Sequence, residues 1–172
     1  IIYGFAHTHL SGTGISDYAD VLLMPTTGKI HLTNGVNEAK INDAQINELG
    51  YASRFSHENE IAKAGYYQVL LDDYNINVEL TSSIRAGVHR YTYPKNEDAN
   101  VILDLKHRDK LLDYKINIID RQTITGFRHS TEWARDQRIY FTLKFSIPFL
   151  NPITNGAELN EEHEGFNNEK NV

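Results

Sequence analysis

The chain has 172 residues, a formal net charge of −6 at pH 7 and a pI near 5.7. A chain of this length can form one domain that buries roughly two-thirds of the surface its unfolded form exposes. Lys and Arg are scattered among more numerous acids, so there is no basic stripe of the kind that phosphate backbones select, and nucleic acid is not an expected partner. No apolar run reaches the roughly 18 residues of a membrane-spanning helix, so no membrane partner is expected.

Cysteine is absent, which excludes disulfides and thiolate zinc sites but leaves the cellular compartment open. The chain starts at Ile1 without an initiator Met, and we therefore expect a processed product or a cut piece of a longer protein that begins inside a folded region. Localisation cannot be read from these residues alone.

The first polar strip is "GFAHTHLSGTGISDYADVLLMP", residues 4–25. On a strand, His7 and His9 would project from the same face, because alternate side chains do. Such a pair can bind a metal, donate to a sugar hydroxyl or satisfy neighbouring carbonyls. A metal would need a third ligand, and no fixed spacing ties the pair to the candidates, which are Asp17, Asp20, His57 and Glu58.

The glycines that follow the histidines, Gly12 and Gly14, allow the backbone a tight or left-handed course. This suits a loop that presents Ser11, Thr13 and Ser16 at a strand end. It does not match a phosphate-binding loop, since the Lys and the helix start of that motif are missing.

Residues 37–49, "NEAKINDAQINEL", are the one stretch that competes as a helix. Ile41, Ala44 and Leu49 approach the spacing of a single helix face. A short helix and an irregular loop are both left open.

The second polar cluster, "RFSHENE", brings Arg54, His57, Glu58 and Glu60 together. Two carboxylates two residues apart could suggest an acid/base pair. A catalytic pair has to straddle its substrate, however, at about 5 to 10 Å in glycosidases, and usually comes from different elements. We interpret the cluster as a solvent-facing, salt-bridged turn with Arg54 or Arg85 as partner.

Two-residue alternation dominates the remaining sequence and is clearest in "RIYFTLKFSIPF", residues 138–149. The alternation predicts a half-buried strand that lines the core from the centre of a sheet. Its inward positions are Ile139, Phe141, Leu143, Phe145 and Ile147. Further strands are predicted by the runs "YYQVLL", "NINVELTSSI", "GVHRYTY", "NVILDL" and "YKINII".

Turn residues separate these runs, at Thr27-Gly28, Asn34-Gly35, Ala86-Gly87 and Pro94-Lys95-Asn96. This punctuation favours long antiparallel ribbons over βαβ units. The pattern predicts about eight to ten strands in an all-β, antiparallel β-sandwich.

A third cluster, "GFRHSTEWARDQ", holds the only Trp, Trp133, among Arg128, Arg135 and Arg138. Such a Trp can stack on a sugar ring or anchor an interface through a cation–π contact. We interpret it as packing under a loop.

From Asn151 onward the composition changes to Asn, Glu and Gly, with too little apolar content to pack. We expect a domain over residues 1–151 and a polar linker or tail over residues 152–172.

Four stretches resemble, in the same order, the amino-terminal β-sandwich domain of glycoside hydrolase family 92, the calcium-dependent exo-α-mannosidases. They are "IYGFAHTHLSGTGISDYADVLLMP", "RFSHENEIAKAGYYQVLL", "VELTSSIRAGVHRYTYP" and "WARDQRIYFTLKFSIPF". The resemblance covers roughly residues 1–151. It implies a supersandwich of the galactose-mutarotase-like type, without the helical catalytic barrel.

The resemblance also implies an inverting enzyme that removes terminal mannose from mannose-rich glycans, with α-1,2 linkages the expected target. The missing C-terminal barrel domain of the same chain would supply the acid, the base and the ligands of Ca²⁺, so we expect no catalytic or metal residue in this fragment. Export from a bacterium is the expected localisation. The residues expected at the mannose pocket or the domain interface are His7, His9, Ser11, Gly12, Asp17, His57 and Glu58.

Two other hypotheses compete with this one. The ten Tyr residues and the polar loop suit a free-standing carbohydrate-binding β-sandwich. A small metal-dependent enzyme built on His7 and His9 is the other, and it would require stoichiometric metal in the purified chain.

Overall fold

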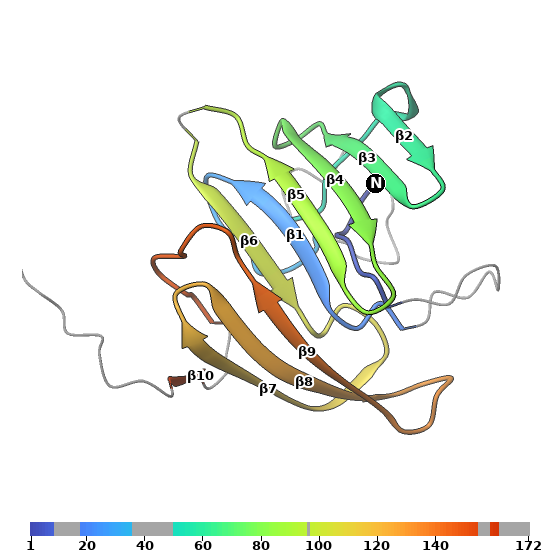
Figure 1. Cartoon of the computed structure of the whole chain (residues 1–172), viewed down its shortest axis with the longest axis vertical. Helices are drawn as coiled ribbons and strands as arrows, with labels where there is room; N and C mark the ends of the chain where they lie inside the picture. Colours follow the sequence, from blue (N-terminus) through green and yellow to red (C-terminus); the bar gives the residue numbers. More distant parts are fainter. Residues whose placement is uncertain (9–17, 36–49, 96, 155–158, 162–172) are drawn as a thin grey trace, which may run out of the picture. The chain divides into compact units, whose positions relative to one another are not determined.

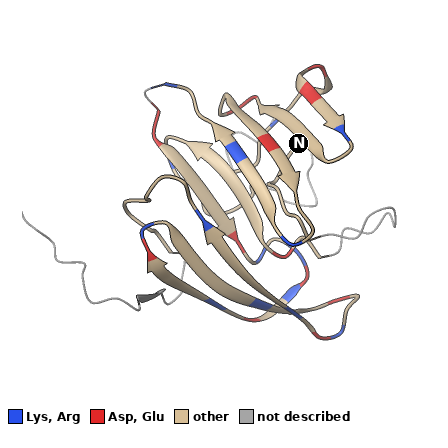
Figure 2. Ribbon diagram, viewed as in Figure 1, with Lys and Arg blue, Asp and Glu red and all other residues tan. Residues whose placement is uncertain are grey.

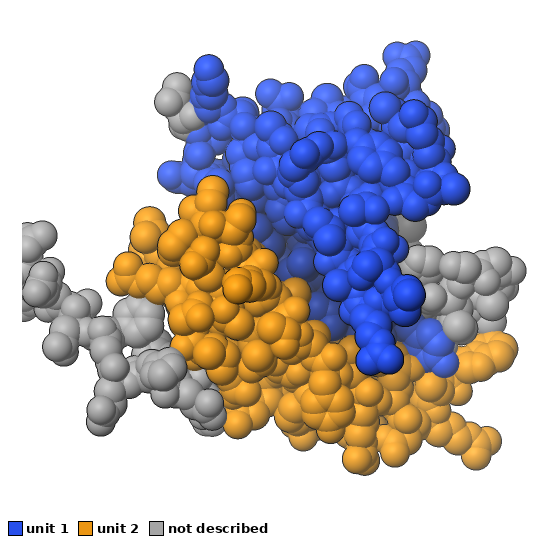
Figure 3. All heavy atoms as spheres, in the orientation of Figure 1, with its two compact units in different colours: residues 1–108 blue, residues 109–172 orange. Residues whose placement is uncertain are grey.

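The computed structural model describes residues 1–8, 18–35, 50–95, 97–154 and 159–161. In these ranges the chain is all-β, with ten strands and one 3-10 turn, η2 (His57–Asn59) (Figure 1). The all-β, antiparallel fold class predicted from the alternation is confirmed. No helix of the described part is long and apolar enough to cross a membrane. The chain divides into two compact units, residues 1–108 and 109–172 (Figure 3).

Unit 1 contains two antiparallel sheets. The smaller one pairs β1 (Leu22–Thr27) with β6 (Ala99–Asp104). The larger one is a meander in chain order of β2 (Glu60–Lys63), β3 (Tyr66–Leu71), β4 (Ile76–Ser82) and β5 (Gly87–Thr92). Strands β2 and β5 are therefore the two edges of the larger sheet.

The two sheets of unit 1 share one apolar core. On β4, Ile76 and Val78 are fully buried and alternate with partly exposed residues, so one face of the strand is turned inward. Side chains from the smaller sheet join this face, as in a β-sandwich. The core cluster consists of Phe5, Leu22, Met24, Tyr51, Val69, Leu71, Ile76, Val78 and Ile102.

Unit 2 is one four-stranded sheet in the order β10-β7-β8-β9. Its antiparallel strands are β7 (Lys110–Asp120), β8 (Thr123–Thr131) and β9 (Gln137–Lys144). Strand β10 (Leu159–Glu161) pairs in parallel with β7. This short strand falls within the segment expected to be a linker or tail, residues 152–172.

Strand β9 shows the predicted alternation but does not lie at the predicted position in its sheet. Ile139, Phe141 and Leu143 are half-buried, whereas their neighbours Tyr140 and Thr142 are exposed. The strand lies at the edge of its sheet, so the prediction of a central strand is wrong. Alternation reports which face of a strand is covered and carries no information on how many strands flank it.

The prediction that Ile147 points inward is also wrong, because its side chain is 77% exposed. The strand ends at Lys144, and Pro148 has no N–H with which to continue a ladder. The chain instead turns back, and the Phe149 N–H donates to the Arg121 carbonyl at 2.9 Å.

The stretch that competed as a helix, residues 37–49, lies outside the described residues. The Thr27-Gly28 turn signal is confirmed, since Gly28 follows the last residue of β1 with a φ of 67°. Such a positive φ suits glycine because a Cβ is disfavoured there.

Candidate functional site

The amino-terminal segment reaches His7 after two isolated bridges. Ile2 pairs with Ser53 and Phe5 pairs with Leu23, both antiparallel. His7 lies beyond these bridges at an exposed bend, so the expectation that it lies on a strand is wrong. The other predicted residues of this loop, His9, Ser11, Gly12 and Asp17, lie outside the described residues, and their roles stay predictions.

The imidazole of His7 lies directly on the backbone of Gly87, the first residue of β5. A Cβ built on Gly87 would meet the His7 Cδ2 at 2.1 Å and Nε2 at 2.4 Å, far inside van der Waals contact. Glycine therefore allows the amino-terminal segment to approach the β4–β5 hairpin at this point.

The same imidazole contacts His89, which lies two residues further along β5. The two rings are edge to face, with centroids 4.7 Å apart. His89 Nδ1 also lies 2.6 Å from the Tyr91 hydroxyl. His7, His89 and Tyr91 thus form a continuous contact that we call the β5 cluster.

The β5 cluster reaches from solvent toward the core. Tyr91 is opposite the buried Val78 on β4, and it packs against the core of unit 1. Burial, with a further contribution from His7, lowers the pKa of His89 to about 4, so its imidazole is neutral at pH 7. Burial also raises the pKa of Tyr91, which keeps its phenol protonated.

Sequence reasoning placed His89 in a predicted strand but did not single it out. A signal was present, because in "GVHRYTY" His89 and Tyr91 share the alternate positions that face inward. The role of Gly87 could not be found in this way, since it depends on where a residue 80 positions earlier in the chain is folded.

The second polar cluster is the turn around η2. Ser56 caps this turn, with its hydroxyl accepting from the Glu58 N–H at 3.2 Å. His57 Nδ1 lies 2.5 Å from Glu60 Oε2, and the Tyr67 hydroxyl donates to Glu60 Oε1 at 2.6 Å. The His57 side chain is 84% exposed, so its other ring nitrogen is accessible to a ligand.

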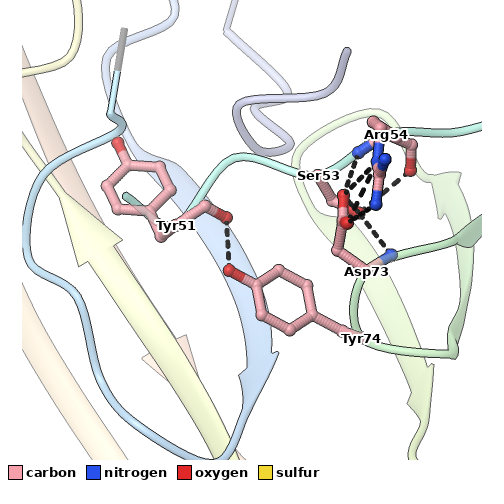
Figure 4. A network of polar contacts seen from close by, with 5 residues as sticks. All are labelled: Tyr51, Ser53, Arg54, Asp73 and Tyr74. Carbon is pink, nitrogen blue, oxygen red and sulfur yellow. Dashed lines mark hydrogen bonds and ion pairs between the residues drawn. The ribbon is translucent and has the colours of Figure 1, made fainter. Parts of the chain in front are cut away.

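The solvent-facing turn predicted for "RFSHENE" is confirmed, but its predicted ion-pair partner is wrong. Arg54 pairs with Asp73, after β3, at 2.6 Å between Nη2 and Oδ1. Asp73 also accepts the Arg54 backbone N–H at 2.7 Å (Figure 4). Partial burial alone would raise the pKa of Asp73, but the hydrogen bonds and charge of Arg54 outweigh it and hold that pKa below its usual value.

Two tyrosines next to this ion pair attach the same segment to the core. The Tyr74 hydroxyl donates to the Tyr51 carbonyl at 3.0 Å (Figure 4), and the Tyr51 hydroxyl donates to Asp104 Oδ2 at 2.5 Å. Tyr51 is fully buried. We interpret this network as structural: it holds residues 51–54 in place, because its polar groups hydrogen-bond to one another.

The β5 cluster and the η2 turn are separate sites. Glu60, Val69, Val78 and Tyr91 are successive partners across the sheet, one on each strand from β2 to β5. Neighbouring strands are about 4.8 Å apart, so the two edges are separated by about 14 Å. The structure therefore does not bring His7 together with His57 and Glu58.

The charged groups of the described part do not form a metal centre. No group of three His, Asp or Glu side chains in the described residues could hold a metal ion. Calcium prefers six to eight oxygen ligands, and the residues described here do not fit it. In the view of Figure 2, acidic and basic segments are interspersed, with no continuous basic stripe.

The interpretation that Trp133 packs under a loop is wrong, because this residue is 65% exposed in the β8–β9 connection. The turn is closed by a hydrogen bond from the Glu132 N–H to the Ala134 carbonyl at 3.0 Å. Arg128 is instead the buried member of this cluster, and it donates to the Ser130 hydroxyl at 2.7 Å.

These features define an antiparallel all-β domain with polar, partly imidazole-lined sheet edges and no metal centre among its described residues. Its sequence matches the model of the glycosyl hydrolase family 92 N-terminal domain over residues 1–171. The chain belongs to this family. No curated protein sequence is significantly similar to it.

Solved structures of a family GH92 α-mannosidase from Bacteroides thetaiotaomicron are similar to this chain. The complex of that enzyme with mannoimidazole shares 37% sequence identity with this chain, at a TM-score of 0.75. A second structure of the same enzyme gives 37% identity and a TM-score of 0.74. Each match covers 85% of this chain and 19% of the enzyme. The matched region is therefore about a fifth of the length of that relative.

Proposed function

We propose that this chain is the accessory N-terminal domain of an exo-acting α-mannosidase that hydrolyses terminal α-1,2-linked mannose from mannose-rich glycans with inversion. The family 92 match across residues 1–171 carries this proposal. The 37% identity to an α-mannosidase solved with mannoimidazole supports it. In this proposal the catalytic groups and the Ca²⁺ site belong to a C-terminal domain of the same polypeptide, and the enzyme is exported from a bacterium.

Two carboxylates of the described part, Glu60 and Glu79, support an accessory role. An inverting glycosidase needs two carboxyl groups about 6.5 to 9.5 Å apart, one of which is a general acid with a raised pKa. Hydrogen bonds from Tyr67 and then His57 instead lower the pKa of Glu60, and those from Arg90 and then Tyr66 lower that of Glu79. These two groups are suited to remain ionised, which does not suit a proton donor.

The experiment is to measure mannose release from an aryl α-mannoside and from α-1,2-mannobiose by the whole enzyme and by residues 1–172 alone. The whole enzyme should release mannose with inverted anomeric configuration, and the shorter chain should release none. Turnover by the purified shorter chain would overturn the accessory role, and an inactive whole enzyme would overturn the mannosidase assignment.

A free-standing carbohydrate-binding module is the second candidate, and the exposure of Trp133 favours it. An exposed indole can stack on a sugar ring. Calorimetric binding of α-1,2-mannobiose to residues 1–172, abolished by Trp133→Ala, would support this function. Absence of binding by the isolated chain would exclude it.

A further inference from the structure

The turn between β4 and β5 exposes an aliphatic side chain more completely than the other large apolar residues of the described chain. Ile84 is 99% exposed, and Val88 on the same hairpin is 53% exposed. Turn positions usually carry Gly, Asn, Asp, Ser or Pro, each for a local backbone reason. None of these reasons applies to a branched aliphatic side chain.

This hairpin tip, residues 82–88, extends beyond its neighbour in the sheet. The last pair that β3 makes with β4 is Tyr66 with Thr81, and the β4–β5 pairing continues to Ser82 with Gly87 (Figure 1). Strand β5 is an edge of the sheet, so among the described residues no strand covers the tip from that side.

The tip is nevertheless held in a defined conformation. The Ser83 N–H donates to the Ala86 carbonyl at 2.8 Å, and the Ala86 N–H donates to the Ser83 hydroxyl at 3.2 Å. At its base, Thr81 donates to the Gly65 carbonyl at 2.7 Å, and His7 lies on Gly87. An ordered apolar tip loses little conformational entropy on binding, which favours association.

Arg85 next to Ile84 adds a charge to the tip. In the described part of the chain, Arg85 is exposed and makes no ion pair or hydrogen bond. An aliphatic side chain beside an unpaired guanidinium matches a recess with apolar walls and a carboxylate at its rim.

We propose that the hairpin tip is the docking element through which this domain contacts the rest of its own enzyme. The proposal rests on the proposed function, and the occupant is the part of the polypeptide that lies outside these 172 residues. Such a part is large in the mannosidase that this chain resembles, because the match covers only 19% of that enzyme. The partner surface is an apolar recess that takes Ile84, with an acidic side chain for Arg85.

Hydrogen–deuterium exchange on the whole enzyme tests this proposal. In the described chain the backbone N–H groups of Ile84 and Arg85 have no acceptor, so in an uncovered tip these two amides exchange at close to the rate of an unstructured peptide. Docking should slow exchange of these two amides, measured in the peptide 83–88, by about tenfold or more. Exchange at the unstructured rate would overturn the proposal.

Two variants of the whole enzyme identify the partner surface. Ile84→Asp should restore fast exchange at the tip and increase exchange in a peptide outside residues 1–172. Ile61→Asp is the matched control, since Ile61 is also exposed, at 40%, but lies on β2 at the opposite edge of the sheet. It should leave that outside peptide unchanged. Protection that depends on protein concentration would assign the tip to a second copy and overturn the proposal.

Mannose release by the same preparation separates this proposal from the proposed function. An active enzyme with an unprotected tip would overturn only the docking role. A protected tip in an inactive enzyme would overturn only the mannosidase assignment.

Discussion

The imidazole of His89 lies edge to face with that of His7, with ring centroids 4.7 Å apart, so a residue of the amino-terminal segment covers a histidine of strand β5. Burial and, to a smaller extent, the neighbouring His7 together lower the pKa of His89 to about 4. The contact connects the folding of the amino-terminal segment with the ionisation of a single group.

The first prediction concerns pH. Because the pKa of His89 is about 4 in the folded chain and about 6.5 in the unfolded chain, the unfolded state binds more protons between these values. The free energy of unfolding should therefore fall as the pH is lowered from 6.5 to 5, by about 1 kcal/mol once partial exposure of the ring is allowed for. Urea unfolding at several pH values measures this slope.

The variant His89→Gln should flatten the slope over this interval, because the replacement does not titrate. His57→Gln serves as a control, since the His57 side chain is 84% exposed. An unchanged slope in His89→Gln would show that another group causes the pH dependence.

The second prediction is a coupling between Gly87 and His7. A Cβ at Gly87 would lie 2.1 Å from the His7 ring, so Gly87→Ala forces one of the two to move. Overpacking of this kind typically costs about 1 to 3 kcal/mol. In a His7→Ala background the same change should cost less than about 0.5 kcal/mol, because the obstructing ring is absent.

A double-mutant cycle with the two single variants and the double variant measures this coupling. His7 is exposed, so its ring can also turn away in Gly87→Ala, and the NMR signals of His89 would then shift. Equal costs in both backgrounds, with the His89 signals unmoved, would mean that the two residues do not touch.

Local pattern was sufficient to predict most strands of this chain. The runs "YYQVLL" and "NINVELTSSI" alternate with period two and are bounded by turn residues, and they became β3 and β4. Which strand lies at an edge was not predictable, because strand order depends on pairing between distant segments. The alternation predicted for β9 is a local property and was correct. Its predicted central position depends on strand order and was wrong.

The candidate site was predicted less completely than the fold. His7 and His57 were chosen because each lies in a polar motif, but the sheet places them at opposite edges. The ion pair of Arg54 was missed because Asp73 is 19 residues away and meets it only after β2 and β3 have folded back. Partners in a β-fold are set by register, which a single sequence shows only locally.

The third prediction corrects the expected cost of truncating Phe141. A large buried aromatic replaced by Ala typically costs about 3 to 5 kcal/mol, but Phe141 is half-buried on an edge strand, so we expect about 1 to 2 kcal/mol. Part of that cost is the loss of its packing on Gly126, which lies opposite it on β8. Urea unfolding followed by far-UV circular dichroism, which reports the strands of both units, measures this cost.

Ile76→Ala is the matched control for this measurement, because Ile76 is fully buried in the core of unit 1. It should cost about 2 to 5 kcal/mol. A Phe141→Ala cost as large as that of Ile76→Ala would mean that β9 is covered more completely than its edge position indicates.

The fourth prediction tests whether the β5 cluster supports the mannose pocket. If His7 braces the pocket in the whole enzyme, His7→Ala should lower kcat/KM for an α-mannoside by roughly 10- to 100-fold, about 1.4 to 2.7 kcal/mol of transition-state stabilisation. Fold stability should change little, because the His7 side chain is exposed.

A purely structural role makes the opposite pattern. His89 would lose the ring that covers it, the melting temperature would fall, and the correctly folded enzyme would keep its specific activity. His7→Gln separates the two roles further, since an amide can replace one hydrogen bond of the imidazole to a sugar hydroxyl but not its edge-to-face packing on His89. Partial recovery of kcat/KM in His7→Gln, with the melting temperature unchanged among the three proteins, is the result expected for the pocket role. A lower melting temperature in both variants with normal turnover would reject it.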